Sequence, residues 1–147
     1  MRGFTLIELL LVIAILLVVS SLAIPFVQSF QTSADLAAQA DTLTTTLRLA
    51  RLQAVTGAHD SAWGVYFDTD NRQFILFKGN GFSSRDAGYD QAFGYPASIV
   101  VTTDLGDEVW FDRYSGTPSA SGTVELADET NQALVFINFY GKIETAR

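Results

Sequence analysis

The side chains that usually carry out enzymatic chemistry are scarce in this chain. There is no cysteine and only one histidine, His59, which is followed by Asp60. Thiolate catalysis and zinc sites built on cysteine are therefore excluded. No nucleophile elbow, metalloprotease helix or phosphate-binding loop occurs in the sequence. We expect His59 to be a solvated loop residue, and we expect neither an enzymatic activity nor a cofactor.

Two groups of acidic residues could hold a cation. Asp68, Asp70 and Asn71 resemble the start of a calcium-binding loop, but the distal glutamate of such a loop is missing at the required spacing. A polar run between two apolar segments is more typical of a hairpin turn. The second group could bind a cation only together with another loop: Asp104, Asp107 and Glu108. The sequence therefore predicts a turn at 68–71 and no metal site.

Glu8 stands apart from the other acidic residues because it lies in an apolar segment. No charged residue follows it until Asp35, and this uncharged run of 26 residues is long enough to cross a membrane as a helix. A carboxylate inside a membrane costs about 2.5–3.5 kcal/mol, so it indicates a site with a partner. The alternatives are a cleaved secretory signal, with the small residues Ser21 and Ala23 before the cut, a simple anchor, and an assembly helix. Glu8 argues against the first two.

Hydropathy and charge divide between the two ends of the chain. The 147 residues combine a mean hydropathy of +0.23 with a net charge of −7. Residues 4–30 include 20 apolar residues among 27, whereas residues 57–147 contain 13 acidic and 6 basic residues. The excess negative charge of the C-terminal part repels nucleic acid and anionic lipid headgroups. We expect a membrane-associated N-terminal segment, one folded domain, and no broad nucleic-acid-binding surface.

A helix and a set of strands must position these residues. Small and apolar residues recur at steps of three and four after the membrane-like segment: Leu36, Ala40, Leu43, Leu47, Ala50 and Ala54. This narrow stripe predicts an amphipathic helix packed on a sheet, and Gly57 is a typical C-terminal stop. We expect one helix from Phe4 to about Thr56.

Alternating apolar residues after His59 predict strands. Residues 63–68 and 73–78 predict a hairpin. We expect further strands at 98–103, 108–113, 123–127 and 134–140, with the last one covered on both faces because it is almost entirely apolar. Seven aromatic residues are expected in the core: Trp63, Phe67, Phe77, Trp110, Phe111, Phe136 and Phe139. The fold class is α+β, with a long N-terminal helix packed on a C-terminal antiparallel β domain.

The segment Gly79–Pro96 has no periodicity that predicts an element. It is rich in glycine, serine and aspartate, and it holds four aromatic residues: Phe82, Tyr89, Phe93 and Tyr95. These aromatic side chains form either a locally packed lid or an exposed loop that binds a partner.

The run Gly3-Phe4-Thr5-Leu6-Ile7-Glu8-Leu9-Leu10 resembles the cleavage and methylation motif of type IV pilins and type II secretion pseudopilins. The resemblance implies that a prepilin peptidase cuts after Gly3 and methylates the new N-terminus at Phe4. It also implies that Glu8 serves subunit assembly, by pairing with the free amine of Phe4 in a neighbouring subunit, and that Pro25 bends the helix. Leaders of that family usually carry several basic residues, whereas Arg2 is the only one here, so either the leader is minimal or its true start lies upstream.

The resemblance also implies an arrangement in the membrane. Residues 1–3 are the leader and residues 4–57 the helix, of which 4–30 are the transmembrane and assembly part and 31–57 the amphipathic part. Residues 58–147 are a periplasmic β-rich domain. With Arg2 before the helix, the positive-inside rule places the N-terminus in the cytoplasm. We therefore expect a single-pass protein of the inner membrane that is drawn into a filament.

A looser resemblance concerns the C-terminal part, which is similar to the H-type minor pseudopilins of type II secretion and to FimT-like minor pilins. Five segments carry it: 47–51, 109–112, 115–116, 122–124 and 139–143. It implies a structural minor pseudopilin of the periplasmic filament that drives protein export. The implied partners are the prepilin peptidase and N-methyltransferase, other pseudopilins or pilins, and the inner-membrane assembly platform. The alternative is a minor type IV pilin, for pilus assembly or, against the acidic charge, for FimT-like DNA uptake.

Overall fold

The structure is a computed structural model that describes residues 4–146, except for the side chains of residues 21–32. The chain divides into two compact units, Met1–Ala34 and Asp35–Arg147. A single helix, α1 (Leu6–Val55), contributes to both units. The predicted long N-terminal helix is therefore confirmed, and each unit is described by itself.

The first unit consists of the N-terminal part of α1. The helix begins at an N-cap within the Thr5-x-x-Glu8 sequence of a capping box: the Thr5 hydroxyl accepts a hydrogen bond from the Glu8 amide (3.3 Å), and the Thr5 carbonyl accepts one from the Leu9 amide (3.2 Å). The apolar side chains from Leu6 to Val19 are exposed. Among the residues whose side chains are described, no helix has an apolar stretch long enough to cross a membrane.

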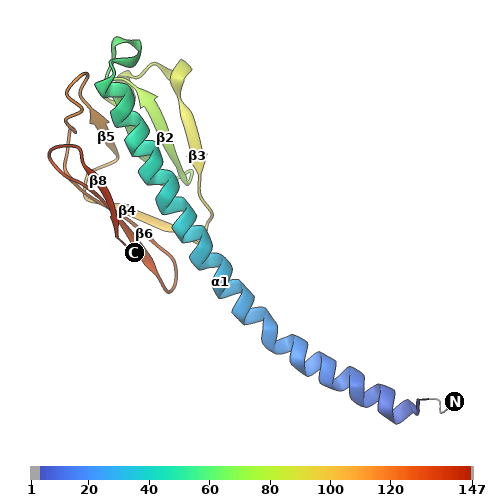
Figure 1. Cartoon of the computed structure of the whole chain (residues 1–147). Coiled ribbons are helices and arrows are strands. Elements are labelled where there is room, and N and C mark those ends of the chain that lie inside the picture. Colours follow the sequence, from blue (N-terminus) through green and yellow to red (C-terminus); the bar gives the residue numbers. More distant parts are fainter. Residues whose placement is uncertain (1–3, 147) are drawn as a thin grey trace. The chain divides into compact units, whose positions relative to one another are not determined.

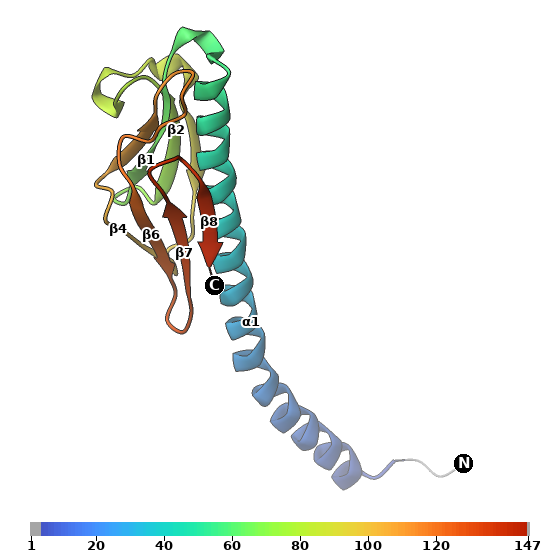
Figure 2. The same cartoon turned by 60° about the vertical axis from the view of Figure 1, so that its left-hand side comes forward.

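The second unit contains the C-terminal part of α1 and eight strands in two antiparallel sheets (Figures 1 and 2). The first sheet has the order β3-β2-β1-β5, and the second has the order β4-β6-β7-β8. The strands are β1 (Trp63–Asp68), β2 (Gln73–Lys78), β3 (Gln91–Gly94), β4 (Val100–Thr103), β5 (Glu108–Phe111), β6 (Gly122–Ala127), β7 (Gln132–Ile137) and β8 (Ile143–Ala146).

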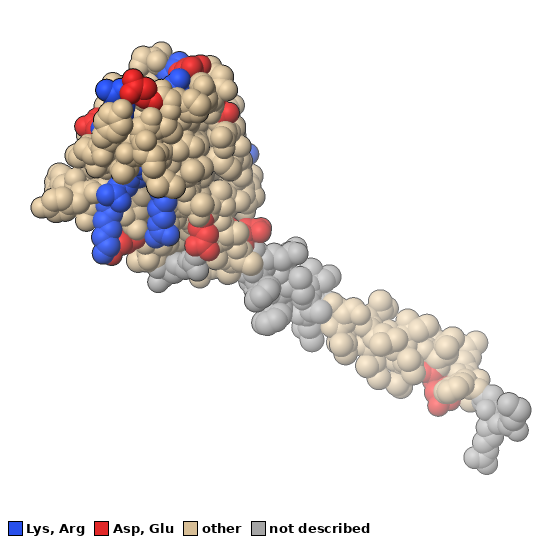
Figure 3. Space-filling view, turned by 45° about the horizontal axis from the view of Figure 1, so that its top comes forward, with Lys and Arg blue, Asp and Glu red and all other residues tan. Residues whose placement is uncertain are grey.

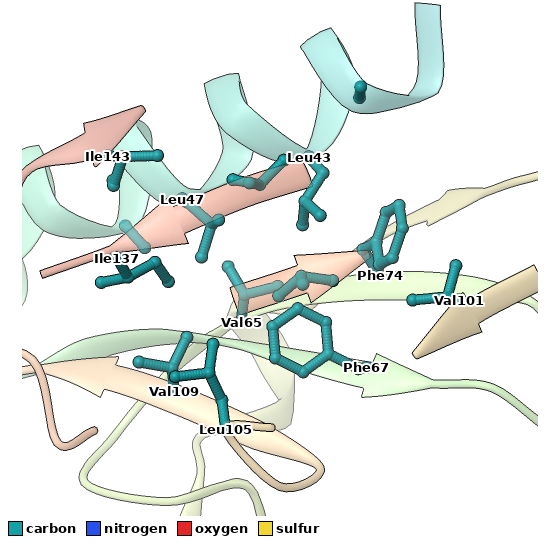
Figure 4. Packing of buried hydrophobic residues seen from close by; sticks show 14 of the residues in the cluster. Leu43, Leu47, Val65, Phe67, Phe74, Val101, Leu105, Val109, Ile137 and Ile143 are labelled. Atoms are coloured by element: carbon teal, nitrogen blue, oxygen red, sulfur yellow. The ribbon is translucent and has the colours of Figure 1, made fainter. Parts of the chain in front are cut away.

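The core lies between α1 and the two sheets. All six residues of the predicted helical stripe are buried, including Leu43 and Leu47, which point from α1 toward Val65 and Phe74 of the first sheet and Ile137 of the second (Figure 4). The alanines of the stripe let the helix approach the sheets closely. The buried residues of the helix and of both sheets form one cluster, so α1 is part of the domain's core rather than a tether.

Gly57 and Tyr114 determine where α1 ends. Gly57 adopts a left-handed conformation (φ 66°), and its amide donates a hydrogen bond to the Ala54 carbonyl (3.0 Å). A Cβ atom at Gly57 would lie 2.3 Å from the ring of Tyr114. Tyr114 in turn donates its amide to the Ala54 carbonyl (2.9 Å), so the helix terminus is satisfied by its own turn and by the β5–β6 connection.

The strand predictions are right for the hairpin and partly wrong elsewhere. The expected strand 134–140 ends at Ile137, because Asn138 starts a tight turn in which its amide donates to the Lys142 carbonyl (3.1 Å). That strand is not covered on both faces: burial alternates along β7, so Phe136 is exposed at its outer face, and Phe139 is exposed in the turn. The prediction that both phenylalanines are core residues is wrong. β3 and β8 were not predicted.

Candidate functional site

The N-terminal residues of α1 have two local features that bear on assembly. Glu8 lies in the first turn of the helix. A negative carboxylate is stabilised there by the positive end of the helix dipole. Phe4 precedes the helix and is 83% exposed. Gly3, the expected cleavage position, lies outside the described residues, and so does the side chain of Pro25. The capping box Thr5-x-x-Glu8 is a readable sequence signal that the assembly interpretation of Glu8 overlooked.

His59 is exposed, as expected, and forms contacts with aromatic neighbours. Its ring lies 4.6 Å from the ring of Tyr89, and its Nδ1 atom is 3.3 Å from the Tyr89 hydroxyl. Tyr89 also meets the buried Trp63 edge-on at 5.9 Å, and the Lys78 ammonium lies 4.4 Å above its ring. These contacts tie the loop after β2 to the end of α1.

The other aromatic residues of the loop also pack locally. Phe82 stacks on Tyr66 with ring centroids 3.9 Å apart, and Tyr95 is buried against Phe74 at 5.0 Å. Burial raises the pKa of the Tyr95 hydroxyl above its ordinary value. The structure therefore favours a packed lid over an exposed partner-binding loop, and part of this segment is the edge strand β3.

The acidic groups accept hydrogen bonds from the backbone and from amide side chains. Asp68 accepts bonds from Asn71 and Gln73, and the Gln73 bond is the main cause that lowers its pKa. This is the predicted hairpin turn. Asp104 accepts the Thr123 amide (2.5 Å), and Glu108 accepts the Phe82 amide (2.5 Å). Among the described residues, no three acidic or histidine side chains converge as a metal site would require.

Two arginines of α1 form a node that sequence reasoning did not identify. Arg51 donates hydrogen bonds to the carbonyls of Gly116 (3.4 Å) and Tyr140 (3.1 Å), and Arg48 donates one to the carbonyl of Ile143 (3.2 Å). The node joins the helix to the β5–β6 connection and to the β7–β8 turn. Gly116 leaves room for the helix at this point, because a Cβ atom there would lie 2.4 Å from Val55 and 3.4 Å from Arg51.

Sequence and structure comparisons identify the family. Residues 1–24 match the prokaryotic N-terminal methylation motif, and residues 39–141 match the family of the type II transport protein GspH. The chain belongs to the GspH family. The expected relationship to pilins and pseudopilins is thereby confirmed, and members of this family are structural proteins rather than enzymes.

Solved structures of related fold agree with this assignment. The GspH-family chain is similar to the type IV minor pilin FimU of Pseudomonas aeruginosa, with a TM-score of 0.62 and 16% identity over 76% of this chain and 93% of that chain. It is also similar to the minor pseudopilin EpsH of the type 2 secretion system of Vibrio cholerae, with a TM-score of 0.60 and 14% identity over 76% and 96%. No curated protein sequence matches the chain significantly.

The comparisons give the GspH-family chain a coarse function. Its fold is that of minor pilins and pseudopilins, so the predicted α+β, pilin-like class is confirmed. The methylation motif implies processing by a prepilin peptidase and assembly with other pilins or pseudopilins. The arginine node and the two glycines that contact it, Gly116 and Gly141, lie within the matched residues 39–141.

Proposed function

We propose that this chain is a minor pseudopilin of a type II secretion system, assembled into the periplasmic filament that drives protein export. The observation that carries the proposal is the match of residues 39–141 to the type II transport protein GspH. The match covers strands β1 to β7 together with most of the part of α1 that packs on them. The partners in this proposal are a prepilin peptidase and N-methyltransferase, sibling pseudopilins, and an assembly platform in the inner membrane.

The N-terminal segment has three tasks in this proposal. Residues 1–3 are a leader that is removed after Gly3, Phe4 becomes the methylated N-terminus, and residues 4–30 hold the chain in the inner membrane. The uncharged run of 26 residues between Glu8 and Asp35 supports the membrane position. The amphipathic part, 31–57, then carries the β-rich domain, 58–147, on the periplasmic side, while the N-terminus faces the cytoplasm. Pro25 gives the helix a bend in its apolar part.

Glu8 sets the axial position of one subunit against the next. Cleavage leaves a positively charged amine on Phe4, and an apolar helix bundle offers that amine few partners other than a carboxylate. Leaving either charge unpaired in apolar surroundings costs several kcal/mol, roughly 3–5 in measured buried pairs. A subunit that is displaced along the filament axis would therefore be penalised, and this penalty selects the register.

The test compares two substitutions at Glu8. Glu8→Gln keeps the capacity to complete the capping box with Thr5 and removes the charge, whereas Glu8→Leu removes both. We expect both variants to enter the membrane and to be cleaved, and both to be depleted from filaments by tenfold or more. Glu129→Gln, which changes an exposed acid of the β domain, serves as the charge-matched control. Normal incorporation of Glu8→Gln would refute the pairing and leave Glu8 as a helix cap.

A second candidate function is that of a minor type IV pilin, which the likeness to FimU favours. The two functions differ in the filament that contains the chain. Immunoprecipitation of sheared surface pili and of periplasmic filaments from the native cells separates them: recovery in surface pili would replace the proposed secretion function. A DNA-uptake role requires a basic surface, yet acidic and basic side chains lie interspersed on the domain face shown in Figure 3.

A further inference from the structure

A groove opens at the end of the β domain where the last turns of α1 meet the β7–β8 turn. It has a volume of about 430 Å³ and is lined mainly by carbon atoms. Its walls come from two segments of the chain: Arg48, Arg51, Leu52 and Val55 of α1, and Gly141, Lys142 and Ile143 of the turn and β8. All of these residues belong to the second compact unit, so the groove is a fixed feature of the domain.

Large apolar side chains are exposed in and beside this groove. Leu52 is 59% exposed and Val55 is 40% exposed, one turn apart on α1. The β7–β8 turn presents Phe139 and Tyr140, which are 78% and 84% exposed. Aromatic residues on a surface are the commonest anchors of protein interfaces.

The turn that presents the two aromatic residues is rigid. The side-chain oxygen of Asn138 accepts hydrogen bonds from the amides of Tyr140 (3.0 Å) and Lys142 (2.8 Å), and the Asn138 carbonyl accepts one from Gly141 (2.9 Å). Arg51 holds the Tyr140 carbonyl from the helix side. Because little backbone entropy remains to be lost, a partner that binds here pays a small ordering cost.

The charges around the groove indicate the chemistry of its occupant. Arg48 and Arg51 donate hydrogen bonds to main-chain carbonyls, and in the described part of the chain neither forms a salt bridge with a carboxylate. Lys142 is paired with Glu144. Two positive charges thus remain uncompensated beside an apolar surface, on a domain whose overall charge is strongly negative. A carboxylate is the complementary group, and the guanidinium group of arginine can bind a carboxylate in bidentate geometry.

We propose that this groove docks an apolar segment that carries one or two carboxylates and belongs to a sibling subunit of the filament. The apolar side chains of that segment cover Leu52 and Tyr140, while its carboxylate pairs with Arg48. That the partner is a filament subunit rests on the function proposed above; the chemistry of the segment rests on the groove alone. A second copy docked through the same face is disfavoured, because the arginines of the two copies would face each other.

The test uses the full-length protein in the cells that make it. A photo-crosslinking benzoylphenylalanine replaces Leu52, and in a matched control it replaces Val100, an equally exposed apolar residue of β4. We expect light to join position 52 to one sibling subunit, at a site within about one helical turn of an aspartate or glutamate. The control position should give no product with that subunit.

Charge reversal then tests the pairing. Arg48→Glu should lower the crosslinked fraction about tenfold, and changing the partner's carboxylate to lysine should restore it, which also shows that the variant is folded. Arg72→Glu, at an exposed arginine in the β1–β2 turn, should change the fraction less than about twofold.

Several results would overturn the inference. The groove chemistry is wrong if position 52 gives no product, if the joined segment lacks a carboxylate, if the product is nucleic acid stacked on the aromatic turn, or if Arg48→Glu has no effect. An acidic segment of a protein outside any filament would overturn the sibling assignment. Absence of cleavage after Gly3 in the wild-type chain would refute the proposed function, and with it the sibling partner, while the crosslinked segment still reports the groove chemistry.

Discussion

Gly141 is the position at which one added methyl group should do the most damage to the β7–β8 turn. Its backbone is left-handed (φ +73°), and a Cβ atom would lie 2.5 Å from the Gly116 carbonyl oxygen and 2.6 Å from Nε of Arg51. Alanine in this conformation costs about 1–2 kcal/mol. Moving Arg51 aside weakens its bonds to two carbonyls, and a hydrogen bond from a charged group contributes about 1.5–3 kcal/mol. We expect Gly141→Ala to destabilise the domain by about 3 kcal/mol or more.

Gly106 provides the matched control. Its backbone is also left-handed (φ +81°), but a Cβ atom there would meet nothing within 4 Å. Gly106→Ala therefore bears only the backbone cost, about 1–2 kcal/mol. The difference between the two variants isolates the steric contact with the arginine node.

The assay is thermal unfolding of the full-length protein in detergent micelles, followed by the fluorescence of the buried Trp63. A change of 1 kcal/mol shifts the Tm of a domain of about this size by roughly 4–8 °C. Gly141→Ala should thus lower the Tm by roughly 12 °C or more, a larger shift than that of Gly106→Ala. Equal shifts for the two variants would refute the contribution of the node.

Two further predictions concern the core and the first hairpin. Leu47→Ala should destabilise the domain by about 2–5 kcal/mol because Leu47 is fully buried between helix and sheets. Leu52→Ala, on the exposed face, should change the unfolding free energy by less than about 0.5 kcal/mol. Equal losses for the two variants in chemical denaturation would contradict the packing. Asp68 has a pKa below its ordinary value of 3.8 in the fold, so its contribution to stability is present above that value and is lost as the pH falls through the lower, folded pKa. Asp68→Asn should therefore make stability fall less steeply below about pH 4, and an unchanged acid-unfolding curve would contradict the role of the Gln73 hydrogen bond.

Elements with a strong local period were predictable from the sequence. The stripe from Leu36 to Ala54 repeats with the helical period, and every member of it is buried. The hairpin of β1 and β2 was predictable because alternating apolar residues flank a run of turn-forming residues. In both cases the pattern that defines the element also defines the face that it buries.

Elements that depend on distant partners were not predictable. β3 has only four residues, three of them exposed or nearly so, and it exists because it pairs with β2. β8 similarly depends on its pairing with β7. The turn between the two strands begins inside the apolar run 134–140, which predicted one long strand. The exposed Phe139 and Tyr140 were misplaced for the same reason: hydrophobicity alone does not show which residues a turn directs outward.

The sequence contains local signals for the N-terminal part of the candidate site, but none for the part in the domain. The apolar run with one acid at Glu8 is a local signal, and so is the capping box that it shares with Thr5. Arg48 and Arg51 gave no such signal, because charged residues on an amphipathic helix normally face solvent. Their contacts with the Gly116, Tyr140 and Ile143 carbonyls require the folded domain.

A pseudopilin is processed at its N-terminus, so the mass of the mature N-terminal peptide is the decisive measurement for the proposed function. The full-length protein is isolated from the membranes of the native cells, and its N-terminal peptide is sequenced by mass spectrometry. We expect the first residue to be Phe4 and its amine to carry a methyl group. An N-terminus at Ile24, after the small residues Ser21 and Ala23, would instead show an ordinary secreted protein and refute the proposed function.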